Sequence, residues 1–285
     1  MNMLAQSLDT NIDIEQIQIS LLRKKSLATK FSHVTALSQT TRQLSKRAIK
    51  RANPKLNDLE LNYLFIKYLY NIELTNDFTR EQVEHMKKND LIQAMEPLVE
   101  VFNQLGILYY IGGSVASSVY GMPRATQDID LVTDLEAKHV KFLEEKLQSA
   151  YYIDKEMILN AIENRGSFNL LHFDTMMKID IFLKKDEPYH KVAFERKRQD
   201  TLDEEDNSLK FFFASSEDII LSKLDWYRLG DYISEQQWRD IQGILKIQRE
   251  SLDIDYLYNW AIQLGLKELL EKAFRDAGYT NENSS

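Results

Sequence analysis

Alternating apolar and polar residues in the middle of the chain predict β-strands. A strand is predicted at 129–133, where Ile129 and Leu131 alternate with Asp128 and Asp130. Because successive strand side chains point to opposite faces, such a segment buries one face and leaves the other polar. Similar patterns predict further strands at 107–111, 167–173, 177–183 and 209–213. Helices are predicted between the strands, at 90–105, from the Gly112-Gly113 turn to Gly121, and at 135–148. The middle of the chain is therefore predicted to form an α/β (α+β) core with a mixed sheet.

Both ends of the chain show the three- to four-residue apolar spacing of helices. The N-terminal helical pattern stops at Asn53-Pro54, and a second helix capped by Asn57 or Asp58 follows it. We expect this pair to fold as a helical hairpin. From Ser215, or Ser216, as a cap, the chain is predicted to be helical to Ala277. Three glycines are expected at or near helix ends in this part: Gly230, Gly243 and Gly265.

These patterns suggest three parts. They are a basic helical module at 1–75, an α/β core at 76–214 and a C-terminal helical region at 215–285. The polar segment 71–89, which contains a capping box at Thr79-x-x-Gln82, is interpreted as the linker between the first two.

Composition excludes several classes of protein. The 285 residues include no cysteine, which excludes a disulfide framework and a thiolate metal site. The five histidines show no ligand spacing, which argues against zinc. We expect no signal peptide and no membrane span, because the longest apolar run, at 63–72, is interrupted by Lys67 and Asn71. A cytoplasmic protein is the expectation.

Charge is unevenly placed along the chain. The net charge is −8, yet residues 21–55 carry ten cations and no acidic residue, which leaves −18 for everything else. Ten unopposed cations can follow a phosphate backbone such as that of RNA or tRNA. The same segment can instead dock on acidic residues of this chain or of a protein partner. The sequence leaves both interpretations open.

Three aspartates form the candidate catalytic set. Asp128 and Asp130 are two apart on a predicted strand, so both carboxylates project from one face. Asp180 is flanked by the apolar Ile179 and Ile181, which places it, together with Lys178, on the polar face of another strand. Nucleotidyl transfer uses two divalent ions about 3.5–4 Å apart and therefore needs several carboxylates on one rigid surface. All three aspartates are candidate metal ligands.

Candidate phosphate-binding residues surround this set. Gly112-Gly113-Ser114 lies between a predicted strand and a predicted helix, where glycine lets the backbone approach an anion and a helix N-terminus directs N–H groups at it. Arg124 is a candidate phosphate clamp, or alternatively a partner of Asp128 or Asp130. Lys223 suits a triphosphate as well as it suits a solvated helix surface.

The motif Gly112-Gly113-Ser114, followed after thirteen residues by Asp128-Ile129-Asp130 and later by Asp180, resembles the polymerase-beta-like nucleotidyltransferases. The longer string through Arg124 to Val132 looks like a bacterial stand-alone group that includes toxins of toxin–antitoxin systems. The resemblance extends from about Leu91 to Ala277. It implies a nucleotidyltransferase-type mixed sheet and transfer of a nucleoside monophosphate from a nucleoside triphosphate, with two Mg²⁺ or Mn²⁺ ions.

The acceptor is not implied by the resemblance. RNA, tRNA or protein is favoured over a small molecule, and regulation by a protein partner is an extension from the resembled group. Two alternatives stay open: a non-catalytic, antitoxin-like binding module that retains the fold, and a small-molecule transferase of the antibiotic-modifying kind.

Overall fold

The computed structural model describes residues 11–70, 91–202 and 209–279. The chain divides into two compact units: the first comprises residues 1–31, 111–123 and 186–285, and the second comprises 32–110 and 124–185. The predicted linker at 71–89 and its capping box lie outside the described residues. In the described part of the chain, no helix is long and apolar enough to cross a membrane.

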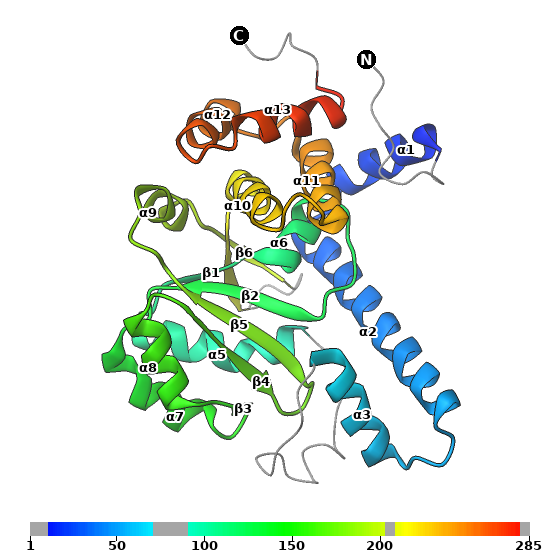
Figure 1. Cartoon of the computed structure of the whole chain (residues 1–285), viewed down its shortest axis with the longest axis vertical. Coiled ribbons are helices and arrows are strands. Elements are labelled where there is room, and N and C mark those ends of the chain that lie inside the picture. The colour runs from blue at the N-terminus through cyan, green and yellow to red at the C-terminus, as the bar shows by residue number, and fades with distance from the viewer. Residues whose placement is uncertain (1–10, 71–90, 203–208, 280–285) are drawn as a thin grey trace. The chain divides into compact units, whose positions relative to one another are not determined.

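The second unit contains strands in the order β3-β4-β5-β2, followed by the start of β1 (Figure 1). Strands β2 and β5 are parallel, whereas β4 is antiparallel to both β5 and β3, so the sheet is mixed as predicted. Burial alternates along both strands: every second residue, beginning with Ile129 in β2 and Met177 in β5, is buried, and the residues between them are half-buried. The strand bounds are β1 Tyr109–Ile111, β2 Asp128–Thr133, β3 Tyr151–Tyr152, β4 Ser167–His172 and β5 Met177–Leu183.

Three helices and a short 3-10 turn accompany these strands. Helix α5 buries an apolar face that includes Leu91, Met95 and Leu98 and confirms the predicted helix at 90–105. Helix α8, which was not predicted, begins at the side chain of Asp154, whose carboxylate accepts hydrogen bonds from two backbone N–H groups. The bounds are α5 Leu91–Leu105, η1 Ala137–His139, α7 Val140–Leu147 and α8 Lys155–Glu163.

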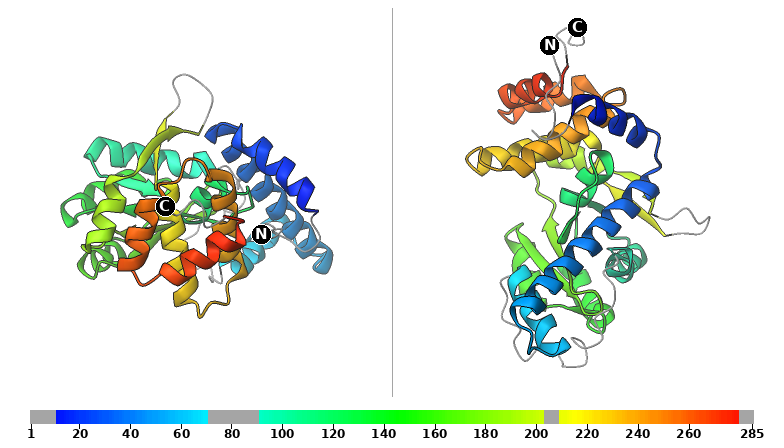
Figure 2. Two further views of the ribbon diagram at one scale, coloured as in Figure 1. Left: turned by 90° about the horizontal axis from the view of Figure 1, so that it is seen from above. Right: turned by 90° about the vertical axis from the view of Figure 1, so that its right-hand side faces the viewer.

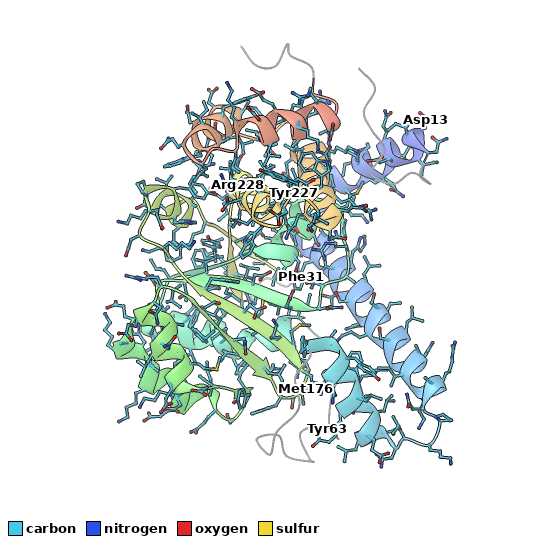
Figure 3. The ribbon with its side chains drawn as sticks, in the orientation of Figure 1. Asp13, Phe31, Tyr63, Met176, Tyr227 and Arg228 are labelled. Atoms are coloured by element: carbon cyan, nitrogen blue, oxygen red, sulfur yellow. The ribbon has the colours of Figure 1, made fainter. Side chains whose placement is uncertain are left out.

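The predicted helical hairpin is present as α2, Leu27–Ala52, and α3, Asp58–Tyr70. Asn57 and Glu60 cap α3 reciprocally through side-chain bonds of 2.8 and 2.9 Å to each other's backbone N–H groups. Phe65 and Ile66 of α3 pack against residues of β4 and of the turn after it, among them Met176, and Tyr63 packs at the edge of this cluster (Figure 3). Apolar packing therefore attaches the hairpin to the sheet of the second unit.

The first unit contains strands in the order β1-β7-β6, with β7 parallel to β1 and antiparallel to β6. Helix α6, Gly113–Tyr120, packs on α10 and α11, and α12 lies beside α13 (Figure 2). The predicted cap at Ser215 is confirmed, because its hydroxyl accepts a hydrogen bond from Asp218 N. The other bounds are α1 Ile12–Arg23, α9 Pro188–Glu195, β6 Arg198–Thr201, β7 Lys210–Phe213, α10 Ser216–Leu229, α11 Glu235–Gln248, α12 Ile254–Gln263 and α13 Lys267–Asp276.

The helical residues before position 75 are thus distributed over both units. Helix α1 and the first residues of α2 belong to the first unit, and the rest of the hairpin belongs to the second. The division at 75 and 214 stays an interpretation of the sequence.

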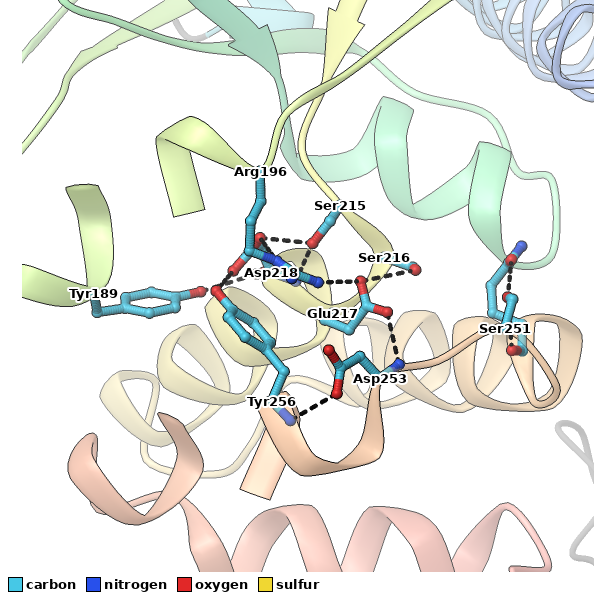
Figure 4. Close-up of polar contacts among 10 residues, drawn as sticks. Tyr189, Arg196, Ser215, Ser216, Glu217, Asp218, Ser251, Asp253 and Tyr256 are labelled. Atoms are coloured by element: carbon cyan, nitrogen blue, oxygen red, sulfur yellow. Dashed lines mark hydrogen bonds and ion pairs between the residues drawn. The ribbon is translucent and has the colours of Figure 1, made fainter. Parts of the chain in front are cut away.

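A polar network surrounds the start of α10 in the first unit (Figure 4). The carboxylate of Asp218 accepts hydrogen bonds from Ser215 Oγ at 2.6 Å and from Tyr256 Oη at 2.7 Å. Arg196 forms an ion pair with Glu217 at 3.4 Å and stacks 3.8 Å over the Tyr256 ring. Burial raises the pKa of Asp218 despite these partners. The network joins α10 to the end of α9 and the start of α12.

One glycine prediction is wrong. Gly243 lies in the middle of α11 and not near a helix end. The reason is steric: a Cβ placed on Gly121, at the end of α6, would lie 2.7 Å from Ser117 O, 3.1 Å from Gly243 C and 3.0 Å from Ile244 N. The backbones of α6 and α11 approach each other here too closely for side chains, so the pair of glycines serves packing.

Gly121→Ala is therefore expected to destabilise the protein by about 1–3 kcal/mol, the usual cost of forcing an extra carbon into a packed site. The obstructing atoms are backbone and cannot rotate away. Urea unfolding measures the change. Gly166→Ala is the matched control, since a Cβ there meets nothing within 4 Å. Equal stabilities of the two variants would contradict the packing argument.

Candidate active site

The three predicted carboxylates lie on one face of two paired strands in the second unit. In the parallel register of β2 and β5, Asp128 is opposite Lys178 and Asp130 is opposite Asp180. Residues paired across a sheet project from the same face, so the four side chains form a two-by-two group. All four are half-buried. The alternation predicted for both strands is confirmed by the burial of Ile129, Leu131, Ile179 and Ile181.

Lys178 supplies one positive charge to three carboxylates. Its Nζ lies 2.8 Å from Asp180 Oδ2. Burial alone would lower the pKa of Lys178, but its hydrogen bond to Asp180 and the charges of Asp180 and Asp128 outweigh burial and raise that pKa. The pKa of Asp128 is raised, first by burial and then by the neighbouring charge of Asp180. The group therefore carries an excess of negative charge.

The donor chemistry of this group fits a hard divalent cation. Carboxylate oxygens are the protein ligands that Mg²⁺ and Mn²⁺ take, and the three carboxylates outnumber the two cations, Lys178 and Arg124, that act on Asp128. In the described residues, however, no three acidic or histidine side chains are gathered closely enough to form a ready-made metal site. The ion pair between Lys178 and Asp180 engages one of the proposed ligands.

Arg124 precedes β2 in the second unit and is half-buried. Its Nη1 donates to Ala125 O at 3.0 Å, and its charge lowers the pKa of Asp128, against the larger effects of burial and of Asp180. The guanidinium is thus close enough to Asp128 to affect its charge. Whether it also contacts a phosphate stays a prediction.

The glycine motif belongs to the first unit. Gly112 follows β1, and Gly113 begins α6 with a φ of +49°, a left-handed conformation that favours glycine. Ser114 is in the first turn of this helix, and its carbonyl accepts a hydrogen bond of 3.0 Å from Ser117 Oγ. The predicted strand, turn and short helix are confirmed. The helix N-terminus presents the backbone geometry that suits an anion.

Lys223, also in the first unit, is buried and paired, so it does not lie on a solvated helix surface. Its Nζ lies 2.8 Å from Asp240 Oδ2 and 2.9 Å from Gln237 Oε1. Asp240 also accepts a bond of 3.3 Å from Ser117 Oγ of α6. Lys223 is therefore joined through Asp240 to the helix that begins with the glycine motif. Sequence reasoning did not identify Asp240, because its partners are distant along the chain.

Much of the basic segment 21–55 is engaged within its own unit. In the second unit, Arg42 donates to Thr175 O and Met176 O, at 3.3 and 3.0 Å, and Lys50 donates to Leu56 O. In the first unit, Arg23 donates to Lys246 O at 2.7 Å and pairs with Glu250 at 3.4 Å. Several of the cations that were expected to face RNA or acidic residues therefore donate hydrogen bonds to backbone carbonyls. Exposed positions in the second unit include Arg47, Arg51 and Lys55.

Lys46 provides a test of this inward orientation. Burial, and then the charge of Arg42, lower its pKa from 10.5 to about 8. Between these two pH values the unfolded chain binds more protons than the folded one, so this group makes the protein more stable as pH rises. We expect the pH dependence of the unfolding free energy over this window to be weaker in Lys46→Met than in wild type. Urea titrations at pH 8 and pH 10 measure it, and parallel slopes would contradict the assignment.

No protein-family model and no curated protein matches the chain. Among solved structures, an antigenic nucleotidyltransferase-like protein from Paracoccidioides brasiliensis is similar at 16% identity and a TM-score of 0.40, over 67% of this chain and 95% of that one. The lincosamide antibiotic adenylyltransferase LnuA is similar at 17% identity and a TM-score of 0.37, over 56% of this chain and 99% of that one. Likenesses this distant assign neither an activity nor a substrate to this chain.

Proposed function

We propose that the protein is a metal-dependent nucleotidyltransferase of the polymerase-beta-like type. The observation that supports this most directly is the register of β2 and β5, which brings Asp128, Asp130 and Asp180 to one face of the sheet. Two Mg²⁺ or Mn²⁺ ions, when bound, would neutralise charge at the α-phosphate and activate the acceptor. Asp128 and Asp130 would hold both ions, and Asp180 would complete the one on the acceptor side.

The remaining residues serve the phosphates and the proton. Gly112, Gly113 and Ser114 would bind the triphosphate through backbone N–H groups and a hydroxyl, with Arg124 as a further phosphate contact. Lys223, which is buried against Asp240, would act only through Asp240 on the helix that begins with the glycine motif. The acceptor oxygen forms a bond to the α-phosphorus, the bond to the bridging oxygen breaks, and pyrophosphate leaves. Asp180 would take the proton of the acceptor hydroxyl.

The acceptor we favour is RNA, tRNA or protein, and a role as the toxin of a toxin–antitoxin system belongs to the same proposal. Arg47, Arg51 and Lys55 are exposed and offer a short basic surface to such an acceptor. A non-catalytic binding module has no use for three carboxylates on one face, where their mutual repulsion costs stability.

The test is incubation of the purified protein with each of four α-labelled nucleoside triphosphates, Mg²⁺ or Mn²⁺, and separate RNA, protein and small-molecule fractions of a cell extract. Label in the RNA or protein fraction that disappears with EDTA supports the proposal. Label in small molecules alone would move the acceptor to the antibiotic-modifying class. Transfer to no fraction, with every nucleotide, would favour the binding module.

A further inference from the structure

The Tyr70 hydroxyl, at the end of α3, contacts residues at the starts of the two strands that carry the carboxylates. It lies 2.8 Å from Met176 O and 3.1 Å from Gln127 O, to which it can donate, and it accepts from Lys178 N at 3.3 Å. Gln127 immediately precedes β2, and Met176 immediately precedes β5. One side chain from the helical hairpin is thus bonded to the start of both strands.

Arg42 of α2 contacts this hydroxyl and the same segment before β5. Its Nη2 donates to Tyr70 Oη at 3.2 Å and to Met176 O at 3.0 Å, and its Nη1 donates to Thr175 O at 3.3 Å. Arg42 is 7% exposed, and its Nε has no hydrogen-bond partner among the described residues. Burial of a charge is costly, and an apolar residue of similar volume often serves stability as well. A buried cation that binds two carbonyls of the residues just before β5 therefore points to a role beyond packing.

A second contact from α2 reaches the start of β2. The buried Ser38 Oγ accepts a hydrogen bond from Thr126 N at 2.9 Å and donates to Val34 O at 2.7 Å. Ser38 and Arg42 are four residues apart and therefore lie on one face of α2. This face contacts the chain just before Asp128 and just before Lys178.

We propose that Tyr70 and Arg42 are positioning residues of the active site, which makes the helical hairpin part of the catalytic apparatus. This inference rests on the proposed function. Across β2 and β5, Asp128 lies opposite Lys178 and Asp130 lies opposite Asp180. These side chains act together only while the starts of the two strands keep this register. Removal of the bridge lets the first pair separate. A misplacement of about 1 Å in a reacting site can cost about 100-fold in rate.

The experiment uses the full chain and compares Tyr70→Phe with a matched control, Asn62→Ala. Asn62 also joins the two helices, because it accepts a bond of 2.8 Å from Lys46 Nζ. Asn62→Ala removes this bond between α3 and α2. Transfer kinetics give kcat and the KM of the nucleotide. Hydrogen exchange at the Lys178 amide reports on the strand start without any need for activity.

We expect kcat of Tyr70→Phe to fall by about 10- to 100-fold with little change in KM, and the Lys178 amide to exchange faster. Arg42→Lys, which retains a donor, should lose less activity than Arg42→Met. Wild-type kcat in Tyr70→Phe, or an equal loss in Asn62→Ala, would overturn the inference. If wild type transfers no label, the proposed function fails instead. Unchanged exchange at the Lys178 amide in Tyr70→Phe would show, independently of activity, that Tyr70 does not hold the start of the strand.

Discussion

Asp128→Asn is expected to lower nucleotide transfer by about 100- to 1,000-fold, the usual cost of removing one group that stabilises charge in the transition state. Asparagine keeps the shape of the side chain and removes the charge that the metal ions need. The folded protein should not lose stability in the absence of metal, because burial and the charge of Asp180 already disfavour the ionised form of Asp128. Activity and stability should therefore change independently.

Labelled-nucleotide transfer and thermal unfolding measure the two effects. Wild type should be stabilised by Mg²⁺ or Mn²⁺ together with nucleotide, and the variant should not. Glu163→Gln is the control for the loss of charge alone. It replaces an exposed carboxylate by an amide at the end of α8, in the same unit. Full activity in Asp128→Asn, or metal-dependent stabilisation equal to that of wild type, would exclude Asp128 as a metal ligand.

Glu15→Gln is expected to destabilise the protein by about 3–5 kcal/mol, because it leaves a buried ammonium without its counter-ion. Glu15 Oε1 lies 2.7 Å from Lys246 Nζ, and both side chains are 1% exposed. The pair attaches α1 to α11 within the first unit. Water does not reach the ammonium, so the lost attraction is not replaced by solvation.

A double variant separates charge from packing. Glu15→Met with Lys246→Met replaces the pair by apolar side chains of similar volume and should recover most of the stability, since such replacements are often neutral or stabilising. Urea unfolding of wild type, both single variants and the double variant completes the cycle. A single variant that loses less than about 1 kcal/mol would indicate that the pair is solvated.

The sequence predicted the parts of the fold in which local pattern and burial agree. The alternation around Asp128 and Asp180 predicted β2 to within a residue and β5 with its bounds, because one buried face fixes the period of a strand. Strand β3, with two residues, is too short to show a period. Helix α9 was missed although Pro188 stands in its first turn, a recognised start signal.

The candidate carboxylates could be named from the sequence, but their surroundings could not. The contacts of Arg42, Lys50 and Tyr70 end on backbone carbonyls, which every residue possesses and which no sequence pattern marks. For the same reason, counting ten cations in 21–55 did not reveal which of them turn inward. The pairing of Lys223 with Asp240 depends on how α10 packs against α11, which is a tertiary property.

The close approach of α6 and α11 has a consequence for large mutational surveys. Any side chain at Gly121 meets three backbone atoms of its surroundings, so nearly every substitution there should be depleted when variants are selected for activity. Such a survey would rank Gly121 beside Asp128, although the first provides only space and the second a charge. Measuring protein abundance alongside activity would separate them: variants of Gly121 would become scarce in the cell, whereas those of Asp128 would stay abundant and have low transfer activity.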